Sequence, residues 1–240
     1  MDVRPIPGLE HLPYAEVWLQ DADEAALREA SAGARAIGKD GLEVWTATQT
    51  PHVAAFLEAR GFAEHRRYVI SELDVAAAPD PGPPAFATVS IAERPDLVPH
   101  VHAIARQAYP AQPGRAETRI GELEEWRVWG LDPHPPDAFL VAVEGASAIG
   151  FGYLTRADGA WAHGFTGVAA AHRGRGVAGA IKRAQIAWAK SHAIHTLRTA
   201  TEARLAGMRA LNRRFGYRPL YEEIVLRGQL AADDAGCLPV

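Results

Sequence analysis

The segment His172–Lys182 reads HRGRGVAGAIK and decides how the second half of the chain is interpreted. It follows an apolar run and opens a stretch whose apolar residues recur at helical spacing. A glycine-rich turn that opens a helix leaves backbone N–H groups unpaired, and the helix dipole favours an anion there. Gly174 and Gly176 would let a large anion approach the backbone closely. Arg173 and Arg175 would add charge-assisted contacts, so the segment predicts an anion site, with a solvated basic turn as the alternative.

The same segment disfavours two familiar phosphate-binding motifs. It lacks the Lys-Ser/Thr ending of a Walker loop. It does contain the Gly-x-Gly-x-x-Gly spacing, at Gly174, Gly176 and Gly179, but residues 180–201 hold no acidic residue of the kind that a dinucleotide-binding fold uses for the ribose. ATP and NAD are therefore weak candidates for the ligand.

The composition is that of an ordinary globular protein, with 240 residues, 48% hydrophobic and 22% charged. The formal net charge of -4 provides no general attraction to nucleic acid or to a membrane surface. A single cysteine, Cys237, excludes an internal disulfide. No apolar run approaches the roughly 18 residues of a membrane helix, and the first residues carry no signal pattern. We expect a cytoplasmic protein without a metal, a nucleic-acid partner or a membrane partner.

A proline-rich stretch at residues 76–86 divides the chain, because prolines fix the backbone and remove hydrogen-bond donors. We expect a first unit at residues 1–75, a second domain at 87–230, and a short tail at 231–240. The second domain shows hairpin-linked strand signals followed by alternating helices and strands. This order predicts an α/β fold with a mixed sheet flanked by helices.

The elements expected in the second domain follow from apolar spacing and turn residues. Strands are expected at 88–92, 138–143, 148–154, 161–169, 194–200 and 218–227, and helices at 95–109, 117–129, 176–192 and 205–215.

The two parts of the chain share an internal repeat. Residues 43–49 (EVWTATQ) are similar to 196–202 (TLRTATE), and residues 56–62 (FLEARGF) are similar to 211–217 (LNRRFGY). Both copies are expected to run helix, strand, helix, strand. Coincidence between two βα units is the alternative.

The second copy resembles a known enzyme family. Arg173–Ala178 matches the Arg/Gln-x-x-Gly-x-Gly/Ala signature of the GNAT N-acetyltransferase superfamily. Thr166–Ala169 is similar to the fourth strand of that family, and Met208–Tyr217 to its Met-x-x-x-Asn-x-x-Leu-Gly-Phe helix. The resemblance implies the GNAT fold, a mostly antiparallel sheet splayed at an acyl-CoA cleft. The first copy then looks like a degenerate half-domain of a tandem protein.

The resemblance implies that acetyl-CoA is the co-substrate. It assigns contacts with the pantetheine to the backbone of Val168, Ala169 and Ala170, and a further contact with CoA to Asn212. It assigns the pyrophosphate to the loop residues Arg173, Gly174, Arg175, Gly176, Val177, Ala178 and Gly179. In the first copy the corresponding residues, 20–24, read QDADE; they lack glycine, and their carboxylates would repel a pyrophosphate.

The catalytic groups are less clearly indicated. Many relatives carry a glutamate on the fourth strand, where this chain has only one titratable group, His163. His163 is the candidate base because imidazole titrates near neutral pH; an outward-facing histidine and water-mediated proton loss are alternatives. Asn212 stands where many relatives carry the tyrosine that acts as the acid, so Tyr221 is the candidate acid, while Tyr217 is expected in the core. Departure of the thiolate without an acid is the alternative.

These assignments predict transfer of an acetyl group to the amine of a small molecule. The acceptor is expected over residues 109–113 and 117–129, where Glu122, Glu124 and Glu125 would attract a cation or simply form a solvated face. A non-catalytic acyl-CoA-binding module is the alternative function. A homodimer remains open.

Overall fold

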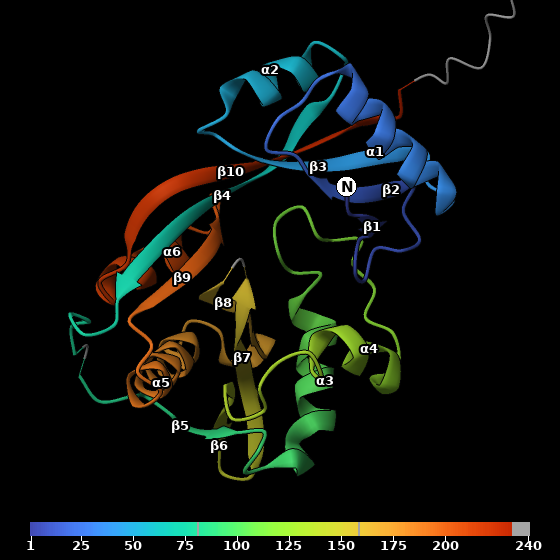
Figure 1. The fold of residues 1–240 in the computed structure, drawn as a ribbon. Helices are drawn as coiled ribbons and strands as arrows, with labels where there is room; N and C mark the ends of the chain where they lie inside the picture. The colour runs from blue at the N-terminus through green and yellow to red at the C-terminus, as the bar shows by residue number, and fades with distance from the viewer. Residues whose placement is uncertain (81, 158, 232–240) are drawn as a thin grey trace, which may run out of the picture. The chain divides into compact units, whose positions relative to one another are not determined.

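The chain forms two compact units in a computed structural model that describes residues 1–80, 82–157 and 159–231 (Figure 1). The first unit comprises Met1–Tyr68 together with residues 221–231, and the second comprises Val69–Leu220 among the described residues. This division differs from the expected one, because the predicted linker at 76–86 lies inside the second unit. Pro81 of that linker, Asp158 in an expected turn and residues 232–240 of the expected tail, with Cys237, lie outside the described residues.

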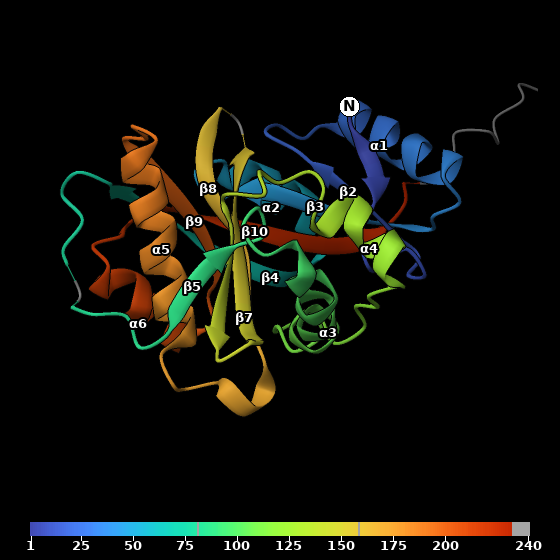
Figure 2. The same cartoon turned by 90° about the horizontal axis from the view of Figure 1, so that it is seen from below.

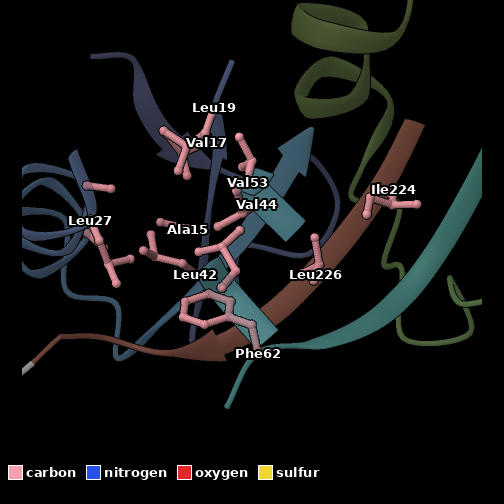
Figure 3. Packing of buried hydrophobic residues seen from close by; sticks show 13 residues of the cluster. Ala15, Val17, Leu19, Leu27, Leu42, Val44, Val53, Phe62, Ile224 and Leu226 are labelled. Carbon is pink, nitrogen blue, oxygen red and sulfur yellow. The ribbon is translucent and has the colours of Figure 1, made fainter. Parts of the chain in front are cut away.

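The first unit is an α/β layer. Strands β2 (Tyr14–Trp18) and β3 (Gly41–Ala47) are parallel, as expected when helix α1 (Glu24–Ala36) connects them. Strand β10 (Arg218–Gln229) pairs antiparallel with β3. An apolar cluster including Val17, Leu42, Val44 and Phe62 fills its core (Figure 3). The elements up to the unit boundary are β1 (Val3–Pro5), β2 (Tyr14–Trp18), α1 (Glu24–Ala36), β3 (Gly41–Ala47), α2 (Pro51–Glu58) and β4 (Ala63–Asp74), with strand order β1-β2-β3-β10-β4.

The second unit carries a mixed, mostly antiparallel sheet with strand order β4-β9-β8-β7-β6-β5. The pairs β5/β6, β6/β7 and β7/β8 are antiparallel, and β8/β9 is parallel. This confirms the predicted fold class. Its elements are β5 (Ala87–Ser90), a 3₁₀ turn (Pro95–Leu97), α3 (Val98–Ala108), α4 (Leu123–Gly130), β6 (Phe139–Glu144), β7 (Ser147–Ala157), β8 (Ala160–Val168), a 3₁₀ turn (Ala170–His172), α5 (Val177–Ser191), β9 (Thr196–Glu202) and α6 (Ala206–Arg214). Strand β10 (Arg218–Gln229) follows, and its residues from Tyr221 on belong to the first unit.

Helices cover both faces of β7 and β8 in this unit (Figure 2). Gly150 of β7 lies against Val177 of α5, at a distance that leaves no room for a Cβ atom. Phe151 points to the opposite face and contacts the Trp126 ring of α4 edge-on. Adjacent residues of β7 therefore point to opposite faces of the sheet and contact different helices, as the pleat of a β-strand requires.

Helix α4 starts later than the sequence pattern indicates, at Leu123 rather than at Glu117. The carboxylate of Glu125 accepts a hydrogen bond of 3.2 Å from the backbone N–H of Glu122. This contact closes a capping box, and a capping box marks the first turn of a helix.

The predicted repeat is confirmed at the level of elements: α1-β3-α2-β4 in the first copy matches α5-β9-α6-β10 in the second. The last strand of each copy extends into the other unit, since β4 ends beside β9 and β10 ends beside β3. Within the first unit a buried carboxylate, Glu43 of β3, bonds to strands β10 and β4. It accepts hydrogen bonds from Arg227 of β10, at 2.9 Å, and from Arg66 of β4.

Within the described ranges, no helix combines the length and the hydropathy needed to cross a bilayer. Among the same residues, no group of three or more His, Cys, Asp or Glu side chains is placed to hold a metal ion.

Candidate active site

The loop before α5 is an uncapped helix start. Gly176 is the N-cap residue with a φ of 89°, and among the described residues α5 has no side-chain cap hydrogen bond at its start. Gly174 has a φ of 74°. Both angles lie in the left-handed region that glycine adopts without a steric penalty. The N–H groups of the first turn therefore have no capping side chain, as an anion site requires.

The charged side chains of this loop already have partners. Arg175 donates to Glu144 at 2.9 Å, and His172 lies 3.2 Å from the same carboxylate. These contacts, His172 first and Arg175 second, lower the pKa of Glu144. Arg173 donates to the carbonyl oxygen of Val168 at 3.2 Å. Exposed ion pairs contribute little to stability. Arg175 can therefore leave its pair with Glu144 and bind an anionic ligand instead.

Strands β8 and β9 part in the middle of the sheet. They pair at Trp161/Leu197, Ala162/Arg198 and His163/Thr199, and the described residues form no later pair between them. Strand β8 continues to Val168 and stays paired with β7 on its other side. Its final backbone groups on the β9 side are therefore open to a ligand.

A β-bulge marks the point where the strands part. Between the pairs Gly152/Thr166 and Leu154/His163, strand β7 has one residue and β8 has two, Gly164 and Phe165. A Cβ atom at Gly164 would lie 1.9 Å from Cε2 of Tyr153, so only glycine fits there. Bulges of this kind redirect the strand and its side chains.

These features surround a cavity of about 570 Å³ in the second unit. The bulge and the end of β8, the glycine loop, the end of α3 with the residues after it, and the start of α6 form its walls. Its lining residues are Ala108, Ala111, Gln112, Phe165, Thr166, Val168, His172, Arg173, Gly174, Gly176, Val177, Ala178, Gly179, Leu205, Gly207, Met208 and Leu211.

Most of the predicted CoA-binding residues lie together in this lining: Val168, Arg173, Gly174, Gly176, Val177, Ala178 and Gly179. Ala169, Ala170 and Arg175 lie in the same loop outside the lining. Asn212 does not reach the cavity, because it is buried and donates to the Thr201 hydroxyl at 2.8 Å. It lines instead a 60 Å³ hollow with Tyr217, Arg209 and their neighbours.

The structure does not bring the predicted base and acid into the cavity. His163 is buried on the α5 side, where Nδ1 donates to Gln185 at 2.8 Å and Nε2 accepts from the Tyr217 hydroxyl. Burial holds its pKa well below the usual value, and the charge of Lys182 lowers it further, while Gln185 opposes this change. Tyr221 belongs to the first unit and is not among the lining residues. Glu122, Glu124 and Glu125 are exposed and also lie outside the lining.

Sequence reasoning missed the apolar wall of the cavity. The residues that it did not assign are Ala108, Phe165, Thr166, His172, Leu205, Gly207, Met208 and Leu211. Their signal was present only in part: Met208 and Leu211 recur at helical spacing within the α6 motif, and Ala111 and Gln112 fall in the predicted acceptor segment.

The first unit differs at both corresponding places. Strands β2 and β3 stay paired along the whole of β2, from Tyr14/Gly41 to Trp18/Trp45. The side chain of Asp23 accepts from the backbone N–H of Ala26 at 2.8 Å and caps α1. In the first copy, a side chain of the protein therefore accepts a hydrogen bond from a backbone N–H group at the helix start. In the second copy, the corresponding start of α5 has no side-chain cap among the described residues.

The comparisons with known proteins agree with this geometry. The model of the acetyltransferase (GNAT) family matches residues 98–217, which include β8, the glycine loop and α6, and the chain belongs to this family. A search of the curated proteins finds no match.

Solved structures share the fold at low sequence identity. A GCN5-related N-acetyltransferase from Sphaerobacter thermophilus has a TM-score of 0.72 at 14% identity, over 96% of this chain and 76% of that one. A tandem GNAT protein from the clavulanic acid biosynthesis pathway has a TM-score of 0.64 at 19% identity, over 94% and 78%. A GCN5-related N-acetyltransferase from Kribbella flavida has a TM-score of 0.62 at 17% identity, over 95% and 84%.

Proposed function

We propose that this protein transfers an acetyl group from acetyl-CoA to the amine of a small molecule. The observation that carries the proposal is the open edge of β8 next to the uncapped, glycine-rich start of α5. The unpaired backbone of β8 offers hydrogen bonds to the pantetheine amides, and the first turn of α5 offers N–H groups to the pyrophosphate. Both lie on one cavity in the second unit.

The proposed reaction is direct attack of the amine on the thioester. A backbone N–H of β8 near Val168 would polarise the carbonyl, and such preorganised donors lower the barrier most when water is excluded. The walls formed by Phe165, Met208 and Leu211 supply that apolar surrounding. The amine also needs a group that takes its proton.

The experiment measures acceptor-dependent release of CoA thiol from acetyl-CoA with a panel of small primary amines. We expect release that depends on both substrates. The rival function, a non-catalytic acyl-CoA-binding module, is favoured by the absence of His163 and Tyr221 from the cavity lining. Tight acetyl-CoA binding with no thiol release for any amine would establish the rival and exclude the enzyme.

We also infer that the first copy is a degenerate half-domain that does not bind CoA. Its strands leave no open edge between β2 and β3 over the described length of β2, and the Asp23 carboxylate occupies the helix start where a pyrophosphate would bind. The two copies would then divide their roles, with ligand binding confined to the second.

Asp23→Ala tests this inference. We expect the free energy of unfolding to fall by about 1 kcal/mol, as for other lost N-caps, with unchanged affinity for acetyl-CoA. Denaturant unfolding and calorimetry measure the two quantities. Asp23→Asn is the matched control because asparagine caps a helix equally well. An increase in bound acetyl-CoA per chain in Asp23→Ala would contradict the inference.

A further inference from the structure

The cavity of the second unit lies at the open edge of β8, and its walls come from both faces of that strand. Thr166 points toward α5, since its Oγ1 lies 3.0 Å from the position of a Cβ atom at Gly152, a position that also faces α5. Phe165 points toward α3, since its ring and the Cβ atom of Ala108 both lie 3.1 Å from the position of a Cβ atom at Gly167. The donor and the acceptor can therefore meet at the edge of β8 from opposite faces.

The wall on the α3 face is aromatic and uncharged. The Phe165 ring stacks on Tyr109 at the end of α3, with centroids 3.9 Å apart and planes 17° from parallel. Tyr109 in turn contacts the Trp129 ring of α4 edge-on at 5.4 Å. Burial raises the pKa of Tyr109, so its phenol carries no charge in the neutral range. Gln112 adds an uncharged amide to the lining. This wall suits a ligand with an aromatic ring, because offset-stacked rings attract each other.

The charged side chains of the lining lie in the glycine loop, away from this wall. Among the described residues that line the cavity they are Arg173 and, when protonated, His172, and none is an aspartate or a glutamate. Nε2 of His172 lies 3.2 Å from the Glu144 carboxylate, and its Nδ1 is shielded from solvent. An ammonium ion entering this cavity would lose its hydration without gaining a carboxylate partner, and that is costly. The cavity therefore favours a neutral amine.

A neutral amine needs no base before it attacks the thioester. An acceptor as basic as a lysine side chain, with a pKa of about 10.4, is neutral in fewer than about one molecule in a thousand at pH 7. An amine whose lone pair is shared with an aromatic ring is a much weaker base and is almost entirely neutral at this pH. Such an acceptor is compatible with a lining that offers neither a carboxylate nor an available imidazole.

We propose that the acceptor is an arylamine, bound as the neutral amine with its ring against Phe165 and its nitrogen at the edge of β8. This assignment rests on the proposed function. The amine nitrogen forms a bond to the thioester carbon, and the carbon–sulfur bond breaks with its electron pair moving to sulfur. The nitrogen, positively charged after its attack, gives a proton to water, and the thiolate takes a proton from water. Phe165 and Gln112 are then specificity-determining residues.

Two isomeric amines test this acceptor class. Para-toluidine and benzylamine have the same composition and nearly the same size, but only benzylamine is mostly an ammonium ion at pH 7. We expect kcat/KM at pH 7 to be at least about tenfold higher for para-toluidine, and to rise about tenfold between about pH 7 and 8 for benzylamine alone, because its neutral fraction rises by that factor. Spermidine, which carries several ammonium groups, should be a poorer acceptor than either.

Two substitutions test the wall itself. Gln112→Glu places a carboxylate of nearly the same size in the lining and should raise kcat/KM for benzylamine, relative to para-toluidine, by about fivefold at pH 7. Gln107→Glu is the matched control, because Gln107 is exposed on α3 and lies outside the lining. Phe165→Leu keeps the wall apolar without the ring and should raise KM for para-toluidine about threefold to tenfold. Acetyl-CoA affinity and thermal stability are measured for each variant.

The outcomes separate this assignment from the proposed function. Faster acetylation of benzylamine or spermidine than of para-toluidine at pH 7 would support acetyl transfer to an amine and overturn the arylamine assignment. Equal selectivity of Gln112→Glu and wild type would overturn the placement of the acceptor on the α3 face. A wild type that binds acetyl-CoA but acetylates none of these amines would overturn the proposed function, and this assignment with it.

Discussion

Gly176→Asp should weaken acetyl-CoA binding by about a hundredfold or more. The φ of 89° at this position is strained for any residue with a Cβ atom, at a cost of roughly 1–2 kcal/mol. The new carboxylate would also lie at the helix start and compete with the pyrophosphate for the same N–H groups. Each 1.4 kcal/mol corresponds to about a tenfold change in affinity, so strain and charge together account for the expected loss.

Calorimetric titration with acetyl-CoA measures this effect. Gly176→Ala separates the strain from the charge and should bind with intermediate affinity. Gly38→Asp is the matched control, because Gly38 has a φ of 71° with open space around it and lies in the first unit. Equal affinities of Gly176→Asp and wild type would remove the loop from the site.

Lys182→Met should stabilise the fold at pH 7. Lys182 is only 4% exposed, and its ammonium lies 4.6 Å from the centre of the Tyr217 ring, next to His163. Burial lowers its pKa to about 7. Lowering a pKa by one corresponds to about 1.4 kcal/mol, so the buried lysine costs on the order of 1–3 kcal/mol once its contact with the ring is counted. Methionine fills a similar volume without a charge.

The sign of the pH effect follows from proton counting. Since the pKa of Lys182 is lower in the folded chain than in the unfolded one, the unfolded chain binds more protons above pH 7. The wild type should therefore gain stability relative to Lys182→Met as the pH rises from about 7 toward about 10. Urea unfolding at three pH values between these limits checks this, with the exposed Lys190→Met as control. A constant difference between wild type and Lys182→Met across this range would contradict it.

The sequence was most informative where local chemistry determines the structure. Residues 172–182 predict the loop and α5 because glycine, arginine and apolar spacing act within one short segment. The repeat was recognisable because the same strand and the same Gly-aromatic helix end recur in the same order. These features were sufficient to predict the family and the fold class, both confirmed.

The division into units could not be predicted in the same way. The prolines at 76–86 marked a linker, yet the unit boundary follows β4 and β10, whose pairing is a long-range property. The hydrogen bonds of the buried carboxylate Glu43 show the same long range, because its two arginine partners are 23 and 184 residues away.

The side-chain chemistry of the site was the least predictable part. His163 lies on the strand where a base is expected, but its position in the pleat directs its side chain to α5, where both ring nitrogens are hydrogen-bonded within the protein.

A calorimetric titration of the full chain with acetyl-CoA tests the CoA site most directly. We predict one molecule bound per chain, with the site lost or severely weakened in Gly176→Asp. No binding to the wild type would contradict the assignment of the glycine loop to the CoA site. Two molecules bound per chain would contradict the inference that the first copy does not bind CoA.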